Sequence, residues 1–470
     1  MRKVEIIEKI EITGISSTGK AVGRKDDQVI FVNQGAPGDL IDIKIIGREK
    51  KYLIGYPIFF HRKSIDRTAP LCEHFGVCGG CKWQHLSYPA QLRFKSQQVR
   101  ENLKKISKMR LPEAEPILGS VETDHYRNKL EYTFSNKKWL TQEEIKKKGL
   151  INKNALGFHI PKMFDKILDI NHCHLQPNPS NEIRLALKNF ANTQDLTFYD
   201  IRKQKGLLRN LIIRTTTTQE TMVIVQFGEA DQEKIKKVMQ FLSEKFPRLS
   251  SLLYLVNLKK NETIYDQQIM THMGKDFIIE KIGNLRFKIG PKSFFQTNPK
   301  QAYELYKKIE EFADLKGKEI VFDLYSGTGT IANFIAKNCR KVIGIESVPE
   351  AVEDARINST LNKIYNTAFY AGDMKNMLSG SFIKIHGSPE LVITDPPRMG
   401  MHQNVINALV QLNPERIIYV SCNPATQARD MELMSDHYVA IKTQPIDMFP
   451  HTQHIENIVL LKSKEYVQRS

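Results

Sequence analysis

The segment VFDLYSGTGTIA, residues 321–332, joins an apolar strand to a helix through two closely spaced glycines. Gly327 and Gly329 allow backbone N–H groups and a helix N-terminus to approach a ligand closely. The spacing from Gly327 to Ala332 also matches the dinucleotide fingerprint, which on its own is a weak signal. The segment therefore predicts an adenosine-type cofactor at the carboxyl end of a strand.

Strands and helices alternate on both sides of this turn, beginning with a helix over 299–314. The expected strands are 319–326, 341–347, 367–373, 390–398, 416–424, 439–450 and 455–463. This alternation predicts a parallel, doubly wound sheet with helices on both faces. The C-terminal part is therefore expected to be an α/β, Rossmann-like domain.

A chain of 470 residues is too long for one hydrophobic core. Residues 1–62 alternate apolar and polar positions between turn signals, which predicts a small β-barrel of the oligonucleotide-binding type. Mixed strand and helix patterns from about 120 to 290 predict an α+β domain. We expect three domains, at 1–62, 63–290 and 291–470, with a basic helix near 86–107 that can pack on the last of them.

Composition limits the partners of the protein. The net charge is +17, from 69 Lys and Arg against 52 Asp and Glu, and such a basic surface favours the phosphates of nucleic acids. No apolar run reaches the roughly 18 residues of a membrane span, and the first residues lack the apolar core of a signal peptide. We therefore expect a cytoplasmic protein that does not enter a membrane.

Acidic residues at successive strand ends point to one class of cofactor. Asp323 lies near the end of the strand that precedes the glycine turn. Glu346 ends the next strand, and Asp373 ends the strand after that. These carboxylates can hold an ammonium group, ribose hydroxyls and an adenine amino group, whereas a pyrophosphate would be repelled. S-Adenosylmethionine fits this pattern better than the dinucleotide of a dehydrogenase.

The six cysteines divide into a group and scattered residues. Cys72, Cys78 and Cys81 lie within ten residues of one another, and in a cytoplasmic chain this favours metal ligation or catalysis over disulfides. Cys422 ends the apolar strand RIIYVS and precedes Asn423-Pro424. Taken alone it could be a buried core residue or a thiol presented for chemistry.

The segment DPPR, residues 395–398, ends another apolar strand. It resembles the Asn/Asp-Pro-Pro-aromatic signature of base-modifying methyltransferases, but Arg398 replaces the aromatic residue. In the amino-methylating enzymes that aromatic residue stacks on the base, so its absence argues against methylation of an exocyclic amine. An acid and a guanidinium beside a base instead suit a carbonyl that becomes an enolate.

Five segments together resemble the RNA uracil-5-methyltransferase family. They are SFFQTNP at 293–299, DLYSGTGT at 323–330, DPPR at 395–398, SCNPAT at 421–426 and DMFPHTQHIENIVLL at 447–461. Residues 1–62 resemble the RNA-binding barrel called the TRAM domain. With four cysteines in place, the chain is most similar to the iron–sulfur branch, whose bacterial member methylates 23S ribosomal RNA.

The resemblance implies roles for individual residues. Cys422 is expected to add to C6 of uracil and Glu456 to remove the C5 proton, with His451 and His454 as alternative proton carriers. The family assigns Gln296, Tyr325, Glu346 and Asp395 to S-adenosylmethionine, and Asp373 is expected at the adenine. Phe294 or Phe295 can stack on a base or pack in the core.

The resemblance also implies a [4Fe–4S] cluster held by Cys72, Cys78, Cys81 and Cys173, with zinc as the alternative. We expect a monomer that binds 23S rRNA as substrate. The alternatives are a tRNA uridine C5-methyltransferase and, outside enzymes, an RNA-binding ribosome-assembly factor, which would not need the pair Cys422 and Glu456.

Overall fold

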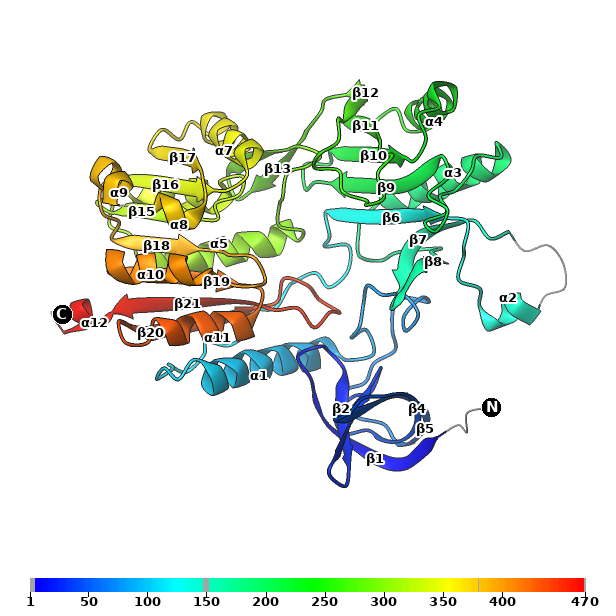
Figure 1. Cartoon of the computed structure of the whole chain (residues 1–470), viewed down its shortest axis with the longest axis horizontal. Helices are drawn as coiled ribbons and strands as arrows, with labels where there is room; N and C mark the ends of the chain where they lie inside the picture. The colour runs from blue at the N-terminus through cyan, green and yellow to red at the C-terminus, as the bar shows by residue number, and fades with distance from the viewer. Residues whose placement is uncertain (1–4, 147–151, 379, 469–470) are drawn as a thin grey trace.

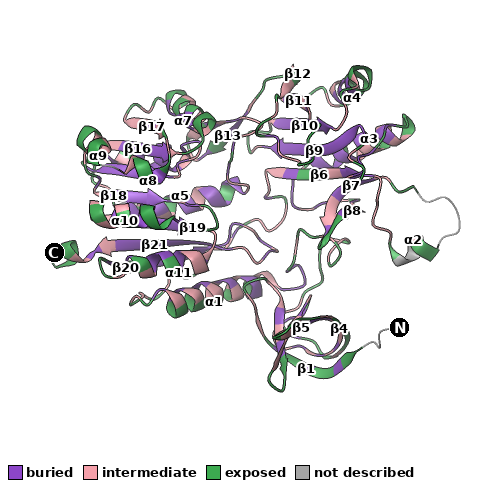
Figure 2. Ribbon diagram, in the orientation of Figure 1, coloured by how far each residue is buried: buried purple, intermediate pink, exposed green. Residues whose placement is uncertain are grey.

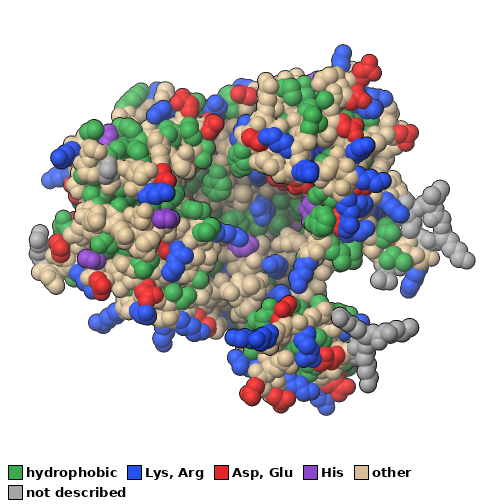
Figure 3. Space-filling view, in the orientation of Figure 1, with side chains coloured by type: hydrophobic (Ala, Val, Ile, Leu, Met, Phe, Trp, Pro, Cys, Tyr) green, Lys and Arg blue, Asp and Glu red, His purple; other side chains and the backbone are tan. Residues whose placement is uncertain are grey.

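The computed structural model describes residues 5–146, 152–378 and 380–468, and its chain forms three lobes around a central hollow (Figures 1 and 3). The N-terminal barrel lies at one corner, a β-sheet lobe with helices forms a second part, and a larger α/β lobe forms the third. The central strands of both large sheets are buried (Figure 2). None of the described helices is both long enough and apolar enough to cross a membrane.

The N-terminal barrel is closed by five strands in the order β1-β2-β3-β5-β4. The strands are β1 (Ile6–Ile15), β2 (Ala21–Lys25), β3 (Gln28–Val32), β4 (Leu40–Arg48) and β5 (Tyr52–Arg62). Alternating residues such as Ile30, Val32, Ile41 and Ile43 face inward and are fully buried. The alternation in the sequence therefore corresponds to a real barrel interior.

The central lobe is built on a seven-stranded sheet in the order β12-β11-β10-β9-β6-β7-β8. Its strands are β6 (Lys129–Ser135), β7 (Ala155–Ile160), β8 (Met163–Asp169), β9 (Leu208–Thr215), β10 (Thr221–Phe227), β11 (Ser251–Val256) and β12 (Met270–Gly274). Its helices are α2 (Gln142–Lys146), α3 (Ser180–Thr193) and α4 (Gln232–Lys245). A hairpin of β13 (Ile278–Ile282) and β14 (Leu285–Ile289) leads into the third lobe.

The C-terminal sheet has seven strands in the order β17-β16-β15-β18-β19-β21-β20. The strands are β15 (Ile320–Leu324), β16 (Lys341–Glu346), β17 (Thr367–Ala371), β18 (Leu391–Thr394), β19 (Arg416–Ser421), β20 (Tyr438–Ile446) and β21 (Glu456–Ser463). The first five are parallel, but β21 pairs antiparallel with both β19 and β20. The prediction of a wholly parallel sheet was therefore wrong for β21, whereas β20, being antiparallel to β21, runs in the same direction as β19. The loop that joins β20 to β21 contains no crossover helix, so these two strands form an antiparallel pair.

The helices of this lobe are α5 (Pro299–Ala313), α6 (Thr330–Ile335), η1 (Ala336–Asn338), α7 (Pro349–Leu361), α8 (Met374–Met377), α9 (Gly380–His386), α10 (Gln403–Leu412), α11 (Pro424–Leu433) and α12 (Lys464–Val467). Sequence patterns did not predict the short helices α8 and α9. The basic helix α1 (Tyr88–Ile106) packs on this lobe, since it contacts α11 and buries Val99 and Leu103 in the C-terminal core.

The glycine turn after β15 has one position that only glycine can occupy. Gly329 has φ +73°, and a Cβ there would lie 2.8 Å from Phe369 and 2.9 Å from Ala355. Gly327 also has positive φ, but a Cβ there would meet nothing within 4 Å. Gly329 thus serves close packing of the turn, whereas Gly327 leaves open space beside it.

We expect Gly329→Ala to lower the free energy of unfolding by about 1–3 kcal/mol, through overpacking and the left-handed backbone together. Urea unfolding followed by circular dichroism measures this change. Gly14→Ala is the matched control, because Gly14 has ordinary φ and a Cβ at that position would meet no atom within 4 Å. Equal stability of the two variants would contradict the packing role of Gly329.

Candidate active site and thiol-lined cavity

The pairing of β19 with β21 brings Cys422 and Glu456 together. Ser421 pairs with Asn457 in this antiparallel ladder, so the residues on either side of the pair, Cys422 and Glu456, face the same end of the two strands. Cys422 is half-buried and Glu456 is 5% exposed. Two residues 34 positions apart in the sequence therefore meet at one strand end.

The surroundings of Cys422 disfavour its ionised form. Burial raises the pKa of the Cys422 thiol to about 11, and the negative charges of Glu456 and Asp395 contribute to this rise. The guanidinium of Arg398 acts in the opposite direction, by its charge and by a hydrogen bond to the sulfur. Arg398 is therefore the group that can favour a thiolate here.

Two carboxyl groups share this low-dielectric site. Burial raises the pKa of Glu456 well above its usual range, and the charge of Asp395 adds to the effect. Burial likewise raises the pKa of Asp395, which follows β18 directly. Two such neighbours do not readily ionise together, because the negative charge of each disfavours that of the other.

Arg398 is held from two sides. Asn423 Nδ2 and Thr426 Oγ1 donate hydrogen bonds to its carbonyl oxygen, at 3.0 and 3.2 Å. Its Nη2 lies 3.0 Å from His454 Nδ1. Burial and the charge of Arg398 lower the pKa of His454 to about 4, so the imidazole is neutral and can accept from the guanidinium. The histidine thus orients Arg398 near the thiol.

The other histidine considered as a proton carrier, His451, lies against α1. Its backbone N–H donates to Gln91 Oε1 at 2.8 Å, and its Nδ1 lies 3.2 Å from Gln91 Nε2. Burial lowers the pKa of His451. Its backbone N–H and its ring are therefore bonded to the helix, whereas Glu456 is the group beside Cys422.

The glycine turn and the adjacent strand end form a second part of the site. Gly327 N donates to Glu346 Oε2 at 3.0 Å, while Ser347 N and Val348 N donate to Oε1. Tyr325, between β15 and the turn, is half-buried with φ +60°, a conformation that is uncommon for a residue with a side chain. Strain of this kind clusters at functional sites.

Asp323 offers a test of whether a cofactor with a donor group fits. Its Oδ2 accepts a hydrogen bond from Ala332 N at 3.1 Å, but no described residue donates to its buried Oδ1. Burial and the charge of Asp395 raise the pKa of Asp323 to about 8. An orphaned acceptor beside an open glycine turn is what an ammonium group or a bridging water would satisfy, so the residues fit S-adenosylmethionine.

Asp373 lies at the N-terminus of α8, one strand further along the edge. Its side chain accepts from Lys375 N at 3.1 Å and lies 3.2 Å from Lys375 Nζ. The structure therefore places Asp373 at the same sheet edge as Glu346, although its carboxylate already has a local partner.

The SFFQTNP loop lies between the two large lobes. Gln296 is half-buried, and its backbone carbonyl oxygen accepts a hydrogen bond from Asn128 Nδ2 at 3.0 Å. Phe295 is in the core, whereas Phe294 is 68% exposed. Of the two rings considered for stacking, only Phe294 is therefore free to meet a base.

All four predicted metal-ligating cysteines line one cavity of about 420 Å³, together with residues of the SFFQTNP loop. The cysteines are Cys72, Cys78, Cys81 and Cys173. Burial raises the pKa of Cys78 to about 11 and that of Cys81 to about 12, and the neighbouring sulfurs contribute to both shifts. Four thiolates would be costly here unless a cation or cluster neutralised them.

Four cysteine thiolates are a ligand set for either of two groups. A tetrahedral zinc ion takes four sulfurs around one metal, whereas each thiolate of a [4Fe–4S] cluster binds a different iron. The shared cavity brings all four cysteines to one place, as either group would require.

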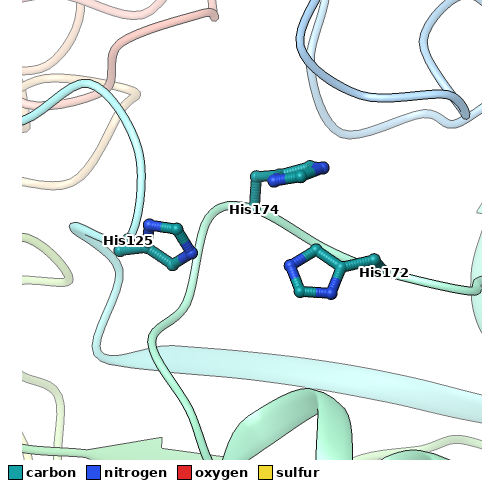
Figure 4. A group of neighbouring side chains, drawn as sticks. All are labelled: His125, His172 and His174. Atoms are coloured by element: carbon teal, nitrogen blue, oxygen red, sulfur yellow. The ribbon is translucent and has the colours of Figure 1, made fainter.

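Three histidines, two of which flank Cys173 in the sequence, lie close together (Figure 4). His125, His172 and His174 each place one ring nitrogen within 4.8 Å of the others. His125 N donates to His174 O at 2.7 Å, which joins the two segments. Burial and mutual repulsion lower the pKa of His172 and His174, so these rings are neutral at the cavity.

Sequence reasoning missed the contacts that hold the site together. The pairs His454–Arg398 and Asn128–Gln296 join segments 56 and 168 residues apart. No local pattern indicates such pairs in one sequence. The only available signal was that Arg398 and His454 each fall inside a segment that resembles the family.

Comparison with known proteins places the site in context. The family model described as tRNA (Uracil-5-)-methyltransferase matches residues 213–464. An uncharacterized RNA methyltransferase of Bacteroides thetaiotaomicron is 52% identical, over 95% of this chain and 100% of the relative. One of Porphyromonas gingivalis is 51% identical, over 96% and 99%.

Among solved structures, the tRNA (uracil-54, C5)-methyltransferase of Pyrococcus abyssi in complex with S-adenosyl-L-homocysteine superposes with a TM-score of 0.74. It is 29% identical in sequence. The match covers 98% of this chain and 100% of the other. The similarity therefore extends over all three lobes.

We expect alkylation of Cys422 by iodoacetamide to accelerate about tenfold per pH unit from pH 7 to 9, because a thiol with a pKa near 11 ionises only in small fractions there. Glu456→Gln should speed the reaction at pH 9 by removing a negative charge. Arg398→Leu should slow it. Peptide mass spectrometry measures the rates at Cys422, with the buried Cys339 as internal reference. A rate independent of pH would mean that the thiol is already ionised at pH 7.

Proposed function

Because the chain belongs to the tRNA (uracil-5-)-methyltransferase family, it is an RNA methyltransferase that uses S-adenosylmethionine, and we propose that it methylates C5 of a uridine in 23S rRNA. The observation that carries the proposed mechanism is the meeting of Cys422 and Glu456 at one end of the β19–β21 ladder. A protein that only binds RNA would need neither a half-buried thiol nor a buried carboxyl group beside it.

Cys422 would begin the reaction by adding its thiolate to C6 of the uracil ring. Electrons then move to the C4 carbonyl as an enolate, and C5 becomes nucleophilic. Arg398 is placed to favour the thiolate and to face the developing negative charge. S-Adenosylmethionine, when bound, supplies the methyl group that C5 attacks, and S-adenosylhomocysteine leaves.

Glu456 would complete the reaction as a general base. Its carboxylate takes the proton from C5, the C5–C6 double bond re-forms, and the Cys422 sulfur leaves C6 as a thiolate. The raised pKa of Glu456 makes its carboxylate a stronger base than an exposed acid once it is ionised. Asp395 supports this role by the repulsion that contributes to the shift.

We assign the cofactor site to Gln296, Tyr325, Glu346, Asp373 and Asp395. Glu346 and the open turn at Gly327 provide the surface for a nucleoside, and the free oxygen of Asp323 adds an acceptor. The target uridine must leave its stack to reach Cys422, which favours a loop or an unpaired strand of RNA. The exposed ring of Phe294 offers a surface on which a base can stack.

We also propose that Cys72, Cys78, Cys81 and Cys173 hold a [4Fe–4S] cluster and that residues 1–62 are a TRAM-type RNA-binding barrel. The four thiols that line one cavity, with the raised pKa values of Cys78 and Cys81, support the cluster. The proposed methyl transfer involves no redox step. The cluster would therefore fix the cavity wall that faces the SFFQTNP loop.

A tRNA uridine is the second candidate substrate, and the similarity to the Pyrococcus abyssi enzyme over 98% of the chain favours it. The two substrates are separated by incubating the protein with tritiated S-adenosylmethionine and either unmodified 23S rRNA or unmodified tRNA. Mapping the labelled nucleotide then identifies the target. Label only in tRNA would replace the first proposal by the second.

We expect Cys422→Ala to reduce methylation by more than about a thousandfold, as removal of a nucleophile does in other enzymes. Glu456→Gln should leave a covalent protein–RNA adduct that persists in denaturing gels, because the C5 proton cannot leave. Cys339→Ala is the control, since this buried cysteine lies in the connection between α6 and β16. Wild-type methylation by Cys422→Ala would refute the mechanism.

Anaerobically purified protein should contain about four iron atoms per chain and absorb visible light as a [4Fe–4S] protein does. Cys81→Ser should lose most of this iron, whereas Cys339→Ser should keep it. Iron analysis and absorption spectra measure the difference. A colourless protein that contains one zinc per chain would show that the site is tetrahedral zinc instead.

A further inference from the structure

A buried ion pair joins helix α1 to the segment that precedes Glu456. Lys95 Nζ lies 2.6 Å from Asp447 Oδ1, and both side chains are fully buried. Lys95 Nζ also donates to the carbonyl oxygen of Phe449 at 3.1 Å. Burial lowers the pKa of Lys95, and the charge of Asp447 offsets part of that effect.

The segment held in this way is the catalytic loop, residues 447–455, which connects β20 to β21. Asp447 follows directly after β20, and Glu456 is the first residue of β21. The loop contributes His454, which contacts Arg398, near its C-terminal end. The position of the loop therefore affects both Glu456 and Arg398, the two groups beside Cys422.

One face of α1 contacts this loop. Tyr88, Gln91 and Lys95 follow the spacing i, i+3, i+7, which aligns them along the helix. Tyr88 Oη donates to Asp447 Oδ2 at 3.0 Å, and Gln91 Oε1 accepts from His451 N at 2.8 Å. Further along the helix, the apolar Val99 and Leu103 enter the C-terminal core. The C-terminal half of the helix thus packs in the core, and its N-terminal half binds the loop through hydrogen bonds and an ion pair.

Stability alone does not account for the ion pair. Removing two charges from water is expensive, and apolar residues of similar volume often serve a fold equally well or better. What the pair supplies is a fixed geometry, because Asp447 Oδ1 also accepts from Phe449 N at 2.9 Å. The ammonium group of Lys95 therefore binds both Asp447 and Phe449, which fixes the start of the loop.

We propose that Lys95 is a positioning residue for the reaction: its ammonium fixes the catalytic loop and thereby holds Glu456 beside Cys422 and His454 against Arg398. This inference rests on the proposed function. In the chain, α1 follows the barrel and the segment that carries Cys72, Cys78 and Cys81. The helix therefore links both of these parts to the catalytic loop.

The test uses the double variant Lys95→Met/Asp447→Asn in the full-length, cluster-loaded protein. The two changes remove the charges together, so neither partner is left buried and unpaired. Lys105→Met is the matched control, because Lys105 lies on the same helix, is 72% exposed and pairs with Glu101 at the surface. Gln91→Ala is a second variant that loosens His451 without touching the ion pair.

We expect the double variant to lower kcat about 10- to 100-fold while KM for RNA and for S-adenosylmethionine changes less than about threefold. The covalent protein–RNA adduct should accumulate, because a displaced Glu456 slows proton removal after Cys422 has added. Gln91→Ala should show the same pattern more weakly. Amide hydrogen exchange across 448–455 should increase in both variants and stay unchanged in Lys105→Met.

Wild-type kcat in the double variant would overturn the proposal. So would a loss of kcat that only follows the folded fraction, with no adduct and no change in exchange of the loop. If the double variant does not fold, the same readouts on Gln91→Ala decide. A failure of the proposed function can be told apart from a failure of this inference. If the proposed function is wrong, the wild-type protein methylates no uridine, but hydrogen exchange still shows whether Lys95 fixes the loop.

Discussion

The antiparallel pairing of β19 with β21 is the constraint on which the site depends. A buried amide network fixes this pairing: Gln427 Nε2 donates to the carbonyl oxygens of Tyr419 and Asn457, and Asn457 Nδ2 donates to Gln427 Oε1. A slip of one residue would turn every side chain of β21 to the other face of the sheet. The register therefore decides whether a carboxyl group lies beside Cys422.

Charge balance in the site follows from that arrangement. The pKa values of Asp323, Asp395 and Glu456 are all raised by burial at one edge of the sheet, and that of the Cys422 thiol is raised for the same reason. Arg398 is the nearby cation that opposes these effects at the sulfur. Burial thus disfavours the charged form of each of these acids, and their negative charges disfavour one another.

Local patterns predicted much of the fold. The five parallel strands were expected from alternation with helices, and the helix near 86–107 lies at 88–106. The direction of β21 was not predictable in this way, since an apolar run has the same pattern in either orientation. The short helices α8 and α9 have too few buried residues for a clear period. Each miss therefore concerns a segment whose form is decided by neighbours distant in sequence.

Short-range spacing and residue type were enough to indicate most of the elements, the glycine turn and the residues able to do chemistry. Which of these residues meet depends instead on how the lobes fold and pack. Folding places Glu456 beside Cys422, His454 against Arg398, and four cysteines around one cavity. It also forms the buried pair Lys95–Asp447, which joins residues 352 positions apart. Contacts of that range depend on strand register and helix packing, and no local pattern carries that information.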